Sequence, residues 1–380
     1  MSEIDHLILF SYLFFVFIGI SKYSQNYVNL HFWKWASVPI ISYVLIIGMR
    51  YGWGADYLWY KYRFEHPDYY GNESPGFYTL NKIMRGLGFN YVMAYITYSS
   101  LYIYGACILI KDFEKNKYML TLFLPATIIF STAIIRQSVA TSFAYIMIFA
   151  ILNKKWLLLL IMSWIVYTIH PVVMAMIVPI FLFVYFFNGH LISLKISVPI
   201  YIICSIFTNL FKDYISTPLS QIIGSMTFGD IGFMNEYAKK SDEWFGSEAI
   251  NADWYQGPVT LLLSMIFDLF VIIVCHIALK NNMNTKIASI YNTVVVGYIS
   301  YRLFFPVEIM HRFTDPLYML YFIPLGYAIY QYKFDYIKWS SKELAVTKIL
   351  LFCGMLYLIP YFLRFIILNP DGSFVWHNLF

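Results

Sequence analysis

The sequence predicts an all-α, polytopic integral membrane protein with about twelve transmembrane helices. Only 12% of its 380 residues are charged and 60% are hydrophobic, whereas a soluble domain carries about 25% charged residues. The apolar residues gather in long runs, and a helix needs about 20 mostly apolar residues to cross a bilayer. No internal repeat divides these runs, so we predict a single membrane domain over residues 1–380.

The predicted spans follow one another along the whole chain. The first begins after an acidic N-terminus, Met-Ser-Glu-Ile-Asp-His, whereas a cleaved secretory signal begins with basic residues, so we expect a permanent span here. Very short turns join the fourth span to the fifth and the sixth to the seventh, which indicates helical hairpins. The apolar runs lie near residues 4–20, 35–50, 89–110, 118–134, 137–153, 156–169, 171–187, 195–211, 257–279, 286–306, 314–332 and 345–366.

Lysine placement indicates how the spans are oriented. If the first loop is cytoplasmic, the inner loops are short and almost purely basic, as the positive-inside rule requires. The longer loops on the opposite side then hold nearly all the acidic residues. Both termini and the two largest loops, residues 50–90 and 212–256, would face outward.

Arginines follow a different distribution from lysines. The planar guanidinium grips carboxylate or phosphate with two hydrogen bonds and stays charged when partly buried, so arginines around an outer cavity suit an anionic ligand. The alternative is that each arginine only extends to the membrane interface. We favour the cavity for Arg50, Arg136 and Arg312, and the interface for Arg63, Arg85 and Arg364. The arginines on or near the predicted outer face are Arg50, Arg63, Arg85, Arg136, Arg302, Arg312 and Arg364.

The first large outer loop combines charged side chains with backbone freedom. Gly52 and Gly54 relax the backbone between Arg50 and Asp56, and Tyr60 follows one helical turn later. We therefore interpret residues 50–60 as a functional segment rather than a plain connection.

Each large outer loop also contains apolar residues at helical spacing, which predicts amphipathic in-plane helices on the membrane surface. The rest of the second loop is acidic and aromatic, and Trp244 could stack on a sugar ring or belong to an interfacial aromatic belt. The two patterns are formed by Phe77, Leu80, Met84 and Leu87, and by Ile215, Leu219, Ile222, Ile223 and Met226.

Three short outer turns carry further titratable side chains. Arg136-Gln137 begins one span, and His170-Pro171 begins another, where the proline suits a first helical turn. The segment from Glu308 to Pro316, which includes His311 and Arg312, precedes the eleventh span.

Asp268 is an ionisable residue near the middle of the predicted ninth span. A carboxylate at that depth needs a partner. It could be protonated and hydrogen-bonded to a serine or tyrosine of a neighbouring helix, or it could pair with an arginine. The four cysteines lie in separate apolar runs and are expected to be packing thiols.

These segments resemble the signature of the EpsG and O-antigen polymerase group. The pattern Arg50…Gly54-x-Asp56-Tyr57…Tyr60 is similar to its first-loop motif, and Glu73-Ser74-Pro75-Gly76-Phe77 resembles its Glu-Pro-Gly-Phe segment with an extra serine. The resemblance covers about residues 45–330. It continues with Ile135-Arg136-Gln137-Ser138-Val139-Ala140, Ile169-His170-Pro171 and His311-Arg312-Phe313.

The resemblance implies a Wzy-type polymerase with a GT-C-like membrane fold, working at the periplasmic face of the bacterial inner membrane. Such enzymes move a growing glycan from one undecaprenyl diphosphate onto a new lipid-linked repeat unit, with inversion of the anomeric centre. The implied partners are the undecaprenyl-diphosphate-linked donor and acceptor, membrane lipid, a chain-length regulator and a repeat-unit flippase. The net charge of +5 is modest and dispersed, which argues against a nucleic-acid partner.

Transfer of a glycan from a lipid diphosphate requires stabilisation of the leaving diphosphate. Many glycosyltransferases use a divalent ion held by Asp-x-Asp, but this sequence contains no such motif, so we predict no metal and no other cofactor. Arginines can supply the same stabilisation. We predict that Arg136 and Arg312, with Arg50 in support, hold the diphosphate.

The reaction also requires a base for the proton of the acceptor hydroxyl. Histidine titrates near neutrality, and His170 matches the family pattern, so it is the first candidate. Asp56 is the second, although it could instead orient Arg50, and His311 or Glu308 follow. Tyr60, Gln137 and Trp244 are further candidates for sugar contacts or support of the site.

Two other classes of membrane protein remain open at this point. A polyprenyl-linked glycosyltransferase that adds single sugars from a lipid monophosphate would use the same cavity, but such enzymes place an acidic pair in the first outer loop, where this chain has Asp56 beside an arginine. A lipid-linked oligosaccharide flippase would show repeated halves and more charged residues within the spans. The charges here gather on one face, which favours a one-sided enzyme.

Overall fold

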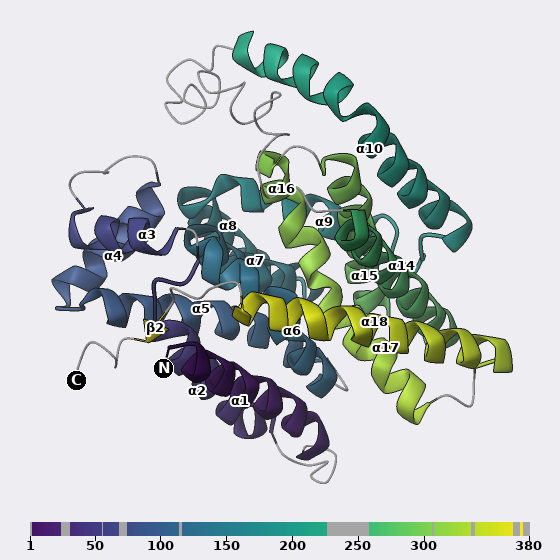
Figure 1. Cartoon of the computed structure of the whole chain (residues 1–380), viewed down its shortest axis with the longest axis horizontal. Coiled ribbons are helices and arrows are strands. Elements are labelled where there is room, and N and C mark those ends of the chain that lie inside the picture. Colours follow the sequence, from purple (N-terminus) through teal and green to yellow (C-terminus); the bar gives the residue numbers. More distant parts are fainter. Residues whose placement is uncertain are drawn as a thin grey trace.

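The computed structural model is almost entirely helical, as predicted (Figure 1). It describes residues 2–23, 31–54, 56–67, 74–113, 116–225, 258–305, 308–335, 339–367 and 373–374. The helices of the first half are α1 (Ser2–Tyr23), α2 (Phe32–Gly48), α3 (Tyr57–Glu65), α4 (Pro75–Gly86), α5 (Tyr91–Ile110), α6 (Lys117–Ala133), α7 (Ile135–Leu152), α8 (Trp156–Ile169), the 3₁₀ helix η2 (Pro171–Met176) and α9 (Ile177–Tyr185). The second half contains α10 (Leu194–Ser225), α14 (Pro258–Asn281), α15 (Thr285–Leu303), α16 (Glu308–Tyr318), the 3₁₀ helix η3 (Met319–Tyr321), α17 (Phe322–Phe334) and α18 (Ser341–Ile367).

Several of these helices begin at side chains that satisfy free backbone N–H groups. Asn90 caps α5 by accepting from the N–H of Met93, and Asn284 caps α15 in the same way. Before α18, Ser340 and Glu343 form a reciprocal capping box: each side chain accepts from the other residue's backbone N–H.

Helix α7 is the centre of the fold. Most of its residues are buried, and α5 and α8 pack along it. Gly105 of α5 allows the closest approach, because a Cβ there would lie 2.3 Å from the backbone oxygen of Ser142. Figure 1 shows α7 in the middle, with α1 and α2 on one side and α10 along the opposite edge. One contiguous hydrophobic core runs from α1 to α18.

Within the described residues, three helices are both long and apolar enough to cross a bilayer: Tyr91–Ile110, Ile135–Leu152 and Leu261–Asn281. Five shorter apolar helices accompany them: Ile8–Gly19, Phe32–Gly48, Trp156–Ile169, Pro171–Tyr185 and Leu194–Thr208. The chain is therefore a helical membrane protein, while the count of about twelve spans stays a prediction.

The two ends of α7 carry different chemistry. With 18 residues, the helix is about 27 Å long at 1.5 Å per residue, close to the thickness of a bilayer core of about 30 Å. Lys111 and Lys155 lie over the ring of Phe149 at its C-terminal end, and Lys286 donates to the side chain of Asn153 nearby. Arg136 lies at its N-terminal end. This separation agrees with the lysine and arginine distributions expected from the sequence.

Two predicted elements differ in detail. The span near 195–211 and the in-plane helix predicted after it form one continuous helix, α10, of 32 residues. Lys212 and Asp213 interrupt the apolar run between the two predicted elements without ending the helix. The span near 314–332 is broken into α16, η3 and α17, and Pro316 lies at the end of α16. A helix, α4, is present where the first in-plane helix was predicted, with Phe77 and Met84 buried; its placement in the plane of the membrane stays a prediction.

A short antiparallel pairing joins the segment after α2 to the C-terminal segment of the chain. Strand β1 (Arg50–Tyr51) pairs with β2 (Ser373–Phe374), with Arg50 opposite Phe374. This pairing begins the segment that leads to Asp56.

Candidate functional site

Five predicted site residues from four separate parts of the chain come together near the N-terminal end of α7. Asp56 and Tyr60 come from the start of α3, Arg136 from the first turn of α7, His170 from the turn before η2, and Arg312 from α16. Each of Asp56, Tyr60 and His170 is close enough to both arginines to interact with them electrostatically. We call these five residues the arginine cluster.

The segment before Asp56 is fixed to the end of α6 by Arg50. This guanidinium is buried, with 1% of its surface exposed. It donates to the backbone oxygens of Ile47, Ser131 and Thr132. The Arg50 guanidinium therefore lies among backbone carbonyl groups that accept from it, which differs from the diphosphate contact expected from the sequence. Its position ties the first loop to the residues that immediately precede Arg136.

Gly54 holds the same two segments together. Its φ of +93° is strained for any residue with a side chain, and a Cβ there would lie 2.0 Å from the backbone oxygen of Thr132. The carbonyl group that excludes a side chain at Gly54 also accepts from Arg50. The Arg50…Gly54 part of the motif thus determines the position of Asp56 relative to α7.

Gly54→Ala is expected to destabilise the protein markedly. The backbone strain alone is worth about 1–3 kcal/mol, and the clash with Thr132 adds to it. Thermal unfolding of the purified protein in detergent measures the effect. Gly86→Ala is the matched control, because a Cβ at Gly86 meets nothing within 4 Å. Equal unfolding midpoints for the two variants would contradict this role of Gly54.

Arg136 is held beside the N-terminus of α4. Its Nη1 donates to the Ser74 side chain at 2.7 Å, and Ser74 precedes the first residue of α4, Pro75. Gly76 in turn packs against Thr168 at the end of α8, where a Cβ would lie 2.4 Å from the Thr168 hydroxyl oxygen. The serine of the Ser-Pro-Gly segment thus orients the arginine directly. The Nε of Arg136 is buried and has no hydrogen-bond partner among the described residues, so one donor remains for a ligand.

Gln137 joins α7 to the helix that carries Arg312. Its side-chain amide donates to the backbone oxygen of Arg312 at 2.7 Å, and the side chain is fully buried. Gln137 is therefore a positioning residue in this structure. Of the two roles considered for it, sugar contact and support of the site, this contact fits support.

His170 and Asp56 have opposite electrostatic environments. Burial, and then the charges of Arg136 and Arg312, lower the pKa of His170 to about 3, so its imidazole is neutral at pH 7. Its Nδ1 is buried without a partner among the described residues. Burial raises the pKa of Asp56, while Arg312 and Arg136 oppose the rise. The Asp56 carboxylate makes no capping hydrogen bond to the N-terminus of α3.

His311 points to a different part of the molecule. Its Nε2 lies 3.0 Å from the backbone oxygen of Phe305, and its ring packs on Tyr301. Burial lowers its pKa to about 4, and the charge that acts on it is that of Arg302. The structure therefore does not bring His311 into the arginine cluster. The side chain of Glu308 and all of Trp244 lie outside the described residues.

Arg302, for which no site role was predicted, pairs with Asp268 in the structure. The Arg302 guanidinium donates to the Asp268 carboxylate through Nε at 2.9 Å, and Tyr201 donates to the same oxygen at 2.7 Å. Of the two partners considered for Asp268, the arginine is present, together with a tyrosine. The isolated carboxylate within an apolar run was the signal that such a partner exists.

The fold and the cluster define a helical membrane protein with an arginine-rich polar site at one end of its central helix. The EpsG family model matches residues 33–376, so the chain belongs to the EpsG family, whose members are Wzy-type polymerase-like proteins. The resemblance inferred from the motifs is thereby confirmed. No curated protein and no solved structure matches the chain.

Proposed function

We propose that this protein is an inverting, metal-independent glycosyltransferase that polymerises undecaprenyl-diphosphate-linked repeat units into O-antigen or a related surface polysaccharide. The proposed site faces the periplasm, on the outer side of the bacterial inner membrane. Family membership supports a polysaccharide polymerase-like protein. The observation that carries the finer proposal is the convergence of Arg136 and Arg312 around Asp56.

Two guanidinium groups near one another suit a ligand with two linked phosphates. Charge-assisted hydrogen bonds from arginine to phosphate are short and about twice as strong as neutral ones. Among the described residues, neither the Nε of Arg136 nor the Nδ1 of His170 has a hydrogen-bond partner. Buried polar atoms of this kind are rare unless a ligand or water satisfies them.

In the proposed displacement, the acceptor hydroxyl oxygen attacks the anomeric carbon of the donor glycan. The bond from that carbon to the diphosphate oxygen breaks, and the diphosphate leaves with the electron pair. Arg136 and Arg312 stabilise the negative charge that develops on it. The hydroxyl proton passes to a carboxylate at Asp56.

The structure favours Asp56 over His170 as the base, which reverses the order inferred from the sequence. A general base works best when its pKa lies near the operating pH. Burial raises the pKa of Asp56 toward that range, whereas the pKa of His170 falls to about 3. We assign His170 to a neutral hydrogen bond with the substrate and Arg50 to positioning the loop.

Deletion of the gene followed by gel analysis of the surface polysaccharide tests this function. A polymerase mutant should leave glycan capped with a single repeat unit. Loss of all glycan would instead indicate a flippase or an assembly transferase. Restoration of the full ladder by the intact gene is the control.

His170→Gln should retain most of the activity, because glutamine keeps a neutral hydrogen-bonding group. We expect a loss of up to about tenfold, the scale of one neutral hydrogen bond, and His170→Ala should lose more. The measurement is the polymerisation rate with lipid-linked repeat units from the deletion strain. A loss of several hundredfold in His170→Gln, with an inflection near pH 6.5 in the wild-type profile, would make His170 the base instead.

A further inference from the structure

A second buried polar group lies on α14 and α15, apart from the arginine cluster. The carboxylate of Asp268 accepts from Arg302 through Nε and Nη2, and the Nη2 group also donates to the Ser264 hydroxyl at 2.9 Å. The side chains of Arg302 and Asp268 are 1% and 8% exposed. Because the two charges neutralise one another, this group is polar but carries no net charge.

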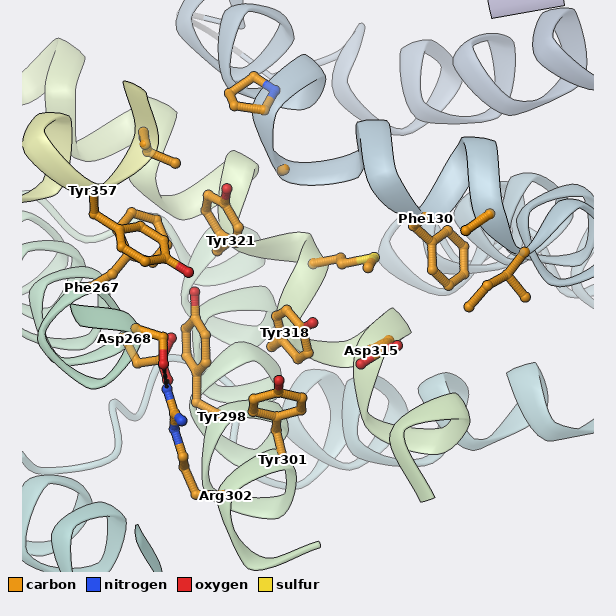
Figure 2. A pocket seen from close by; sticks show the side chains of 17 residues that line it. Phe130, Phe267, Asp268, Tyr298, Tyr301, Arg302, Asp315, Tyr318, Tyr321 and Tyr357 are labelled. Carbon is orange, nitrogen blue, oxygen red and sulfur yellow. Dashed lines mark hydrogen bonds and ion pairs between the residues drawn. The ribbon is translucent and has the colours of Figure 1, made fainter. Parts of the chain in front are cut away.

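A cavity of about 160 Å³ opens beside this pair. Its wall comes from α6, α14, α15, α16, η3 and α18. Figure 2 shows Tyr298, Tyr301 and Tyr318 between the Asp268–Arg302 pair on one side and Asp315 and Phe130 on the other. The rings of Tyr298 and Tyr318 stack with centroids 5.4 Å apart. Tyr321 and Tyr357 also line the space, which we call the tyrosine cavity.

Two polar atoms on this wall lack hydrogen-bond partners among the described residues: the Tyr298 hydroxyl and Nη1 of Arg302. Both side chains are almost fully buried, at 2% and 1% exposure. An unsatisfied buried polar group costs about 1–3 kcal/mol, so such atoms point to a ligand that would pair with them. The ligand must offer hydrogen-bonding groups of its own.

The lining selects the chemical class of that ligand. A phosphate would find no net positive charge, because Asp268 already neutralises Arg302 and Asp315 adds a further carboxylate to the wall. An isoprenoid chain would bury the Tyr298 hydroxyl and the Arg302 N–H without pairing them, which is unfavourable. A neutral sugar offers hydroxyls to these groups and apolar C–H faces to the tyrosine rings.

The tyrosine cavity is joined to the arginine cluster through two shared elements. Ala133 and Ile134 line the cavity and immediately precede the helix that carries Arg136. On α16, Asp315 lines the cavity and stands three residues after Arg312. A sugar in this space would therefore lie next to a diphosphate held by the cluster.

We propose that the tyrosine cavity binds one uncharged sugar unit of the glycan substrate, with Tyr298 and Arg302 as its hydrogen-bonding groups. This inference rests on the proposed function, since it supplies the glycan subsite of the same reaction. It assigns binding, and not the chemistry of transfer, to the Asp268–Arg302 pair.

The test is direct binding of the free oligosaccharide, released by mild acid from the lipid-linked glycan of the deletion strain. Isothermal titration compares the wild type, Tyr298→Phe and Tyr291→Phe in detergent. Tyr298→Phe should weaken oligosaccharide binding about tenfold, the scale of one lost hydrogen bond. Tyr291→Phe should not, because that hydroxyl of the same helix donates to the backbone oxygen of Ile272 and lies outside the cavity.

A second titration uses undecaprenyl diphosphate without sugar. Its affinity should be unchanged in Tyr298→Phe. Weakening of undecaprenyl diphosphate alone would assign the cavity to the isoprenoid. Equal weakening of both ligands would show a general disturbance of the protein, and unchanged oligosaccharide binding would make the cavity structural. Each of these results overturns the proposal. If oligosaccharide binding depends on Tyr298 but the wild type polymerises nothing, the proposed function fails while the sugar site stands.

Discussion

Arg136→Ala is expected to lower the polymerisation rate by about 10²–10³, the scale of removing one preorganised donor from a developing negative charge. The side chain is oriented by Ser74, and its Nε has no partner in the described part of the chain, so its loss removes a donor that is available to the diphosphate. In cells, the variant should produce glycan capped with a single repeat unit. The measurement is the rate with lipid-linked repeat units, alongside the gel pattern.

Arg85→Ala is the matched control for this variant. Arg85 is an exposed residue in the last turn of α4, and its removal should leave the ladder intact. Arg136→Lys separates charge from geometry, because lysine keeps the charge but loses the planar fork, and it should recover only part of the rate. An unchanged ladder in Arg136→Ala, with normal amounts of protein in the membrane, would remove Arg136 from the mechanism.

Asp56→Asn should have an effect of similar or greater size, because loss of a general base costs about 10²–10⁴ in rate. Asparagine keeps the shape of the side chain but cannot accept the proton. The neighbouring arginines should still bind the diphosphate, so the loss is expected in kcat rather than in the affinity for undecaprenyl diphosphate. Asp112→Asn, an exposed change in the turn after α5, is the control.

The pH profile gives an independent test of Asp56. The base must be ionised to work, so the rate should fall as the pH drops through the pKa of Asp56. Burial raises that pKa, so the fall should begin at a higher pH than for an exposed aspartate. Asp56→Glu should retain part of the activity with a shifted profile. Near-wild-type turnover by Asp56→Asn would show that another group takes the proton.

The sequence predicted the helices well because their signals are local. Apolar runs and caps such as Asn90 act within a few residues. The extent of α10 was missed because Lys212 and Asp213 interrupt the apolar run, although the helix continues through them. The helix breaks at η3, shortly after Pro316. The apolar run continues through this break, so a single span was predicted there.

The sequence predicted only part of the arrangement around Asp56. Arg136 and Arg312 were expected to converge because both lie near the ends of predicted spans on one face. Arg50 has the same charge and lies on the same predicted face, yet its donors are taken up by backbone oxygens of another helix. The acceptors of a guanidinium group can lie far away in the sequence, so no local sequence pattern predicts them. The tyrosine cavity was missed likewise, since its wall comes from six separate elements.

Binding of undecaprenyl diphosphate to the purified protein in lipid nanodiscs tests most directly whether the arginine cluster holds two linked phosphates. Arg136→Ala and Arg312→Ala should each weaken binding by about tenfold to a hundredfold, the scale of a charged hydrogen bond, while Arg85→Ala should match the wild type. Equal affinity in all four proteins would contradict the account.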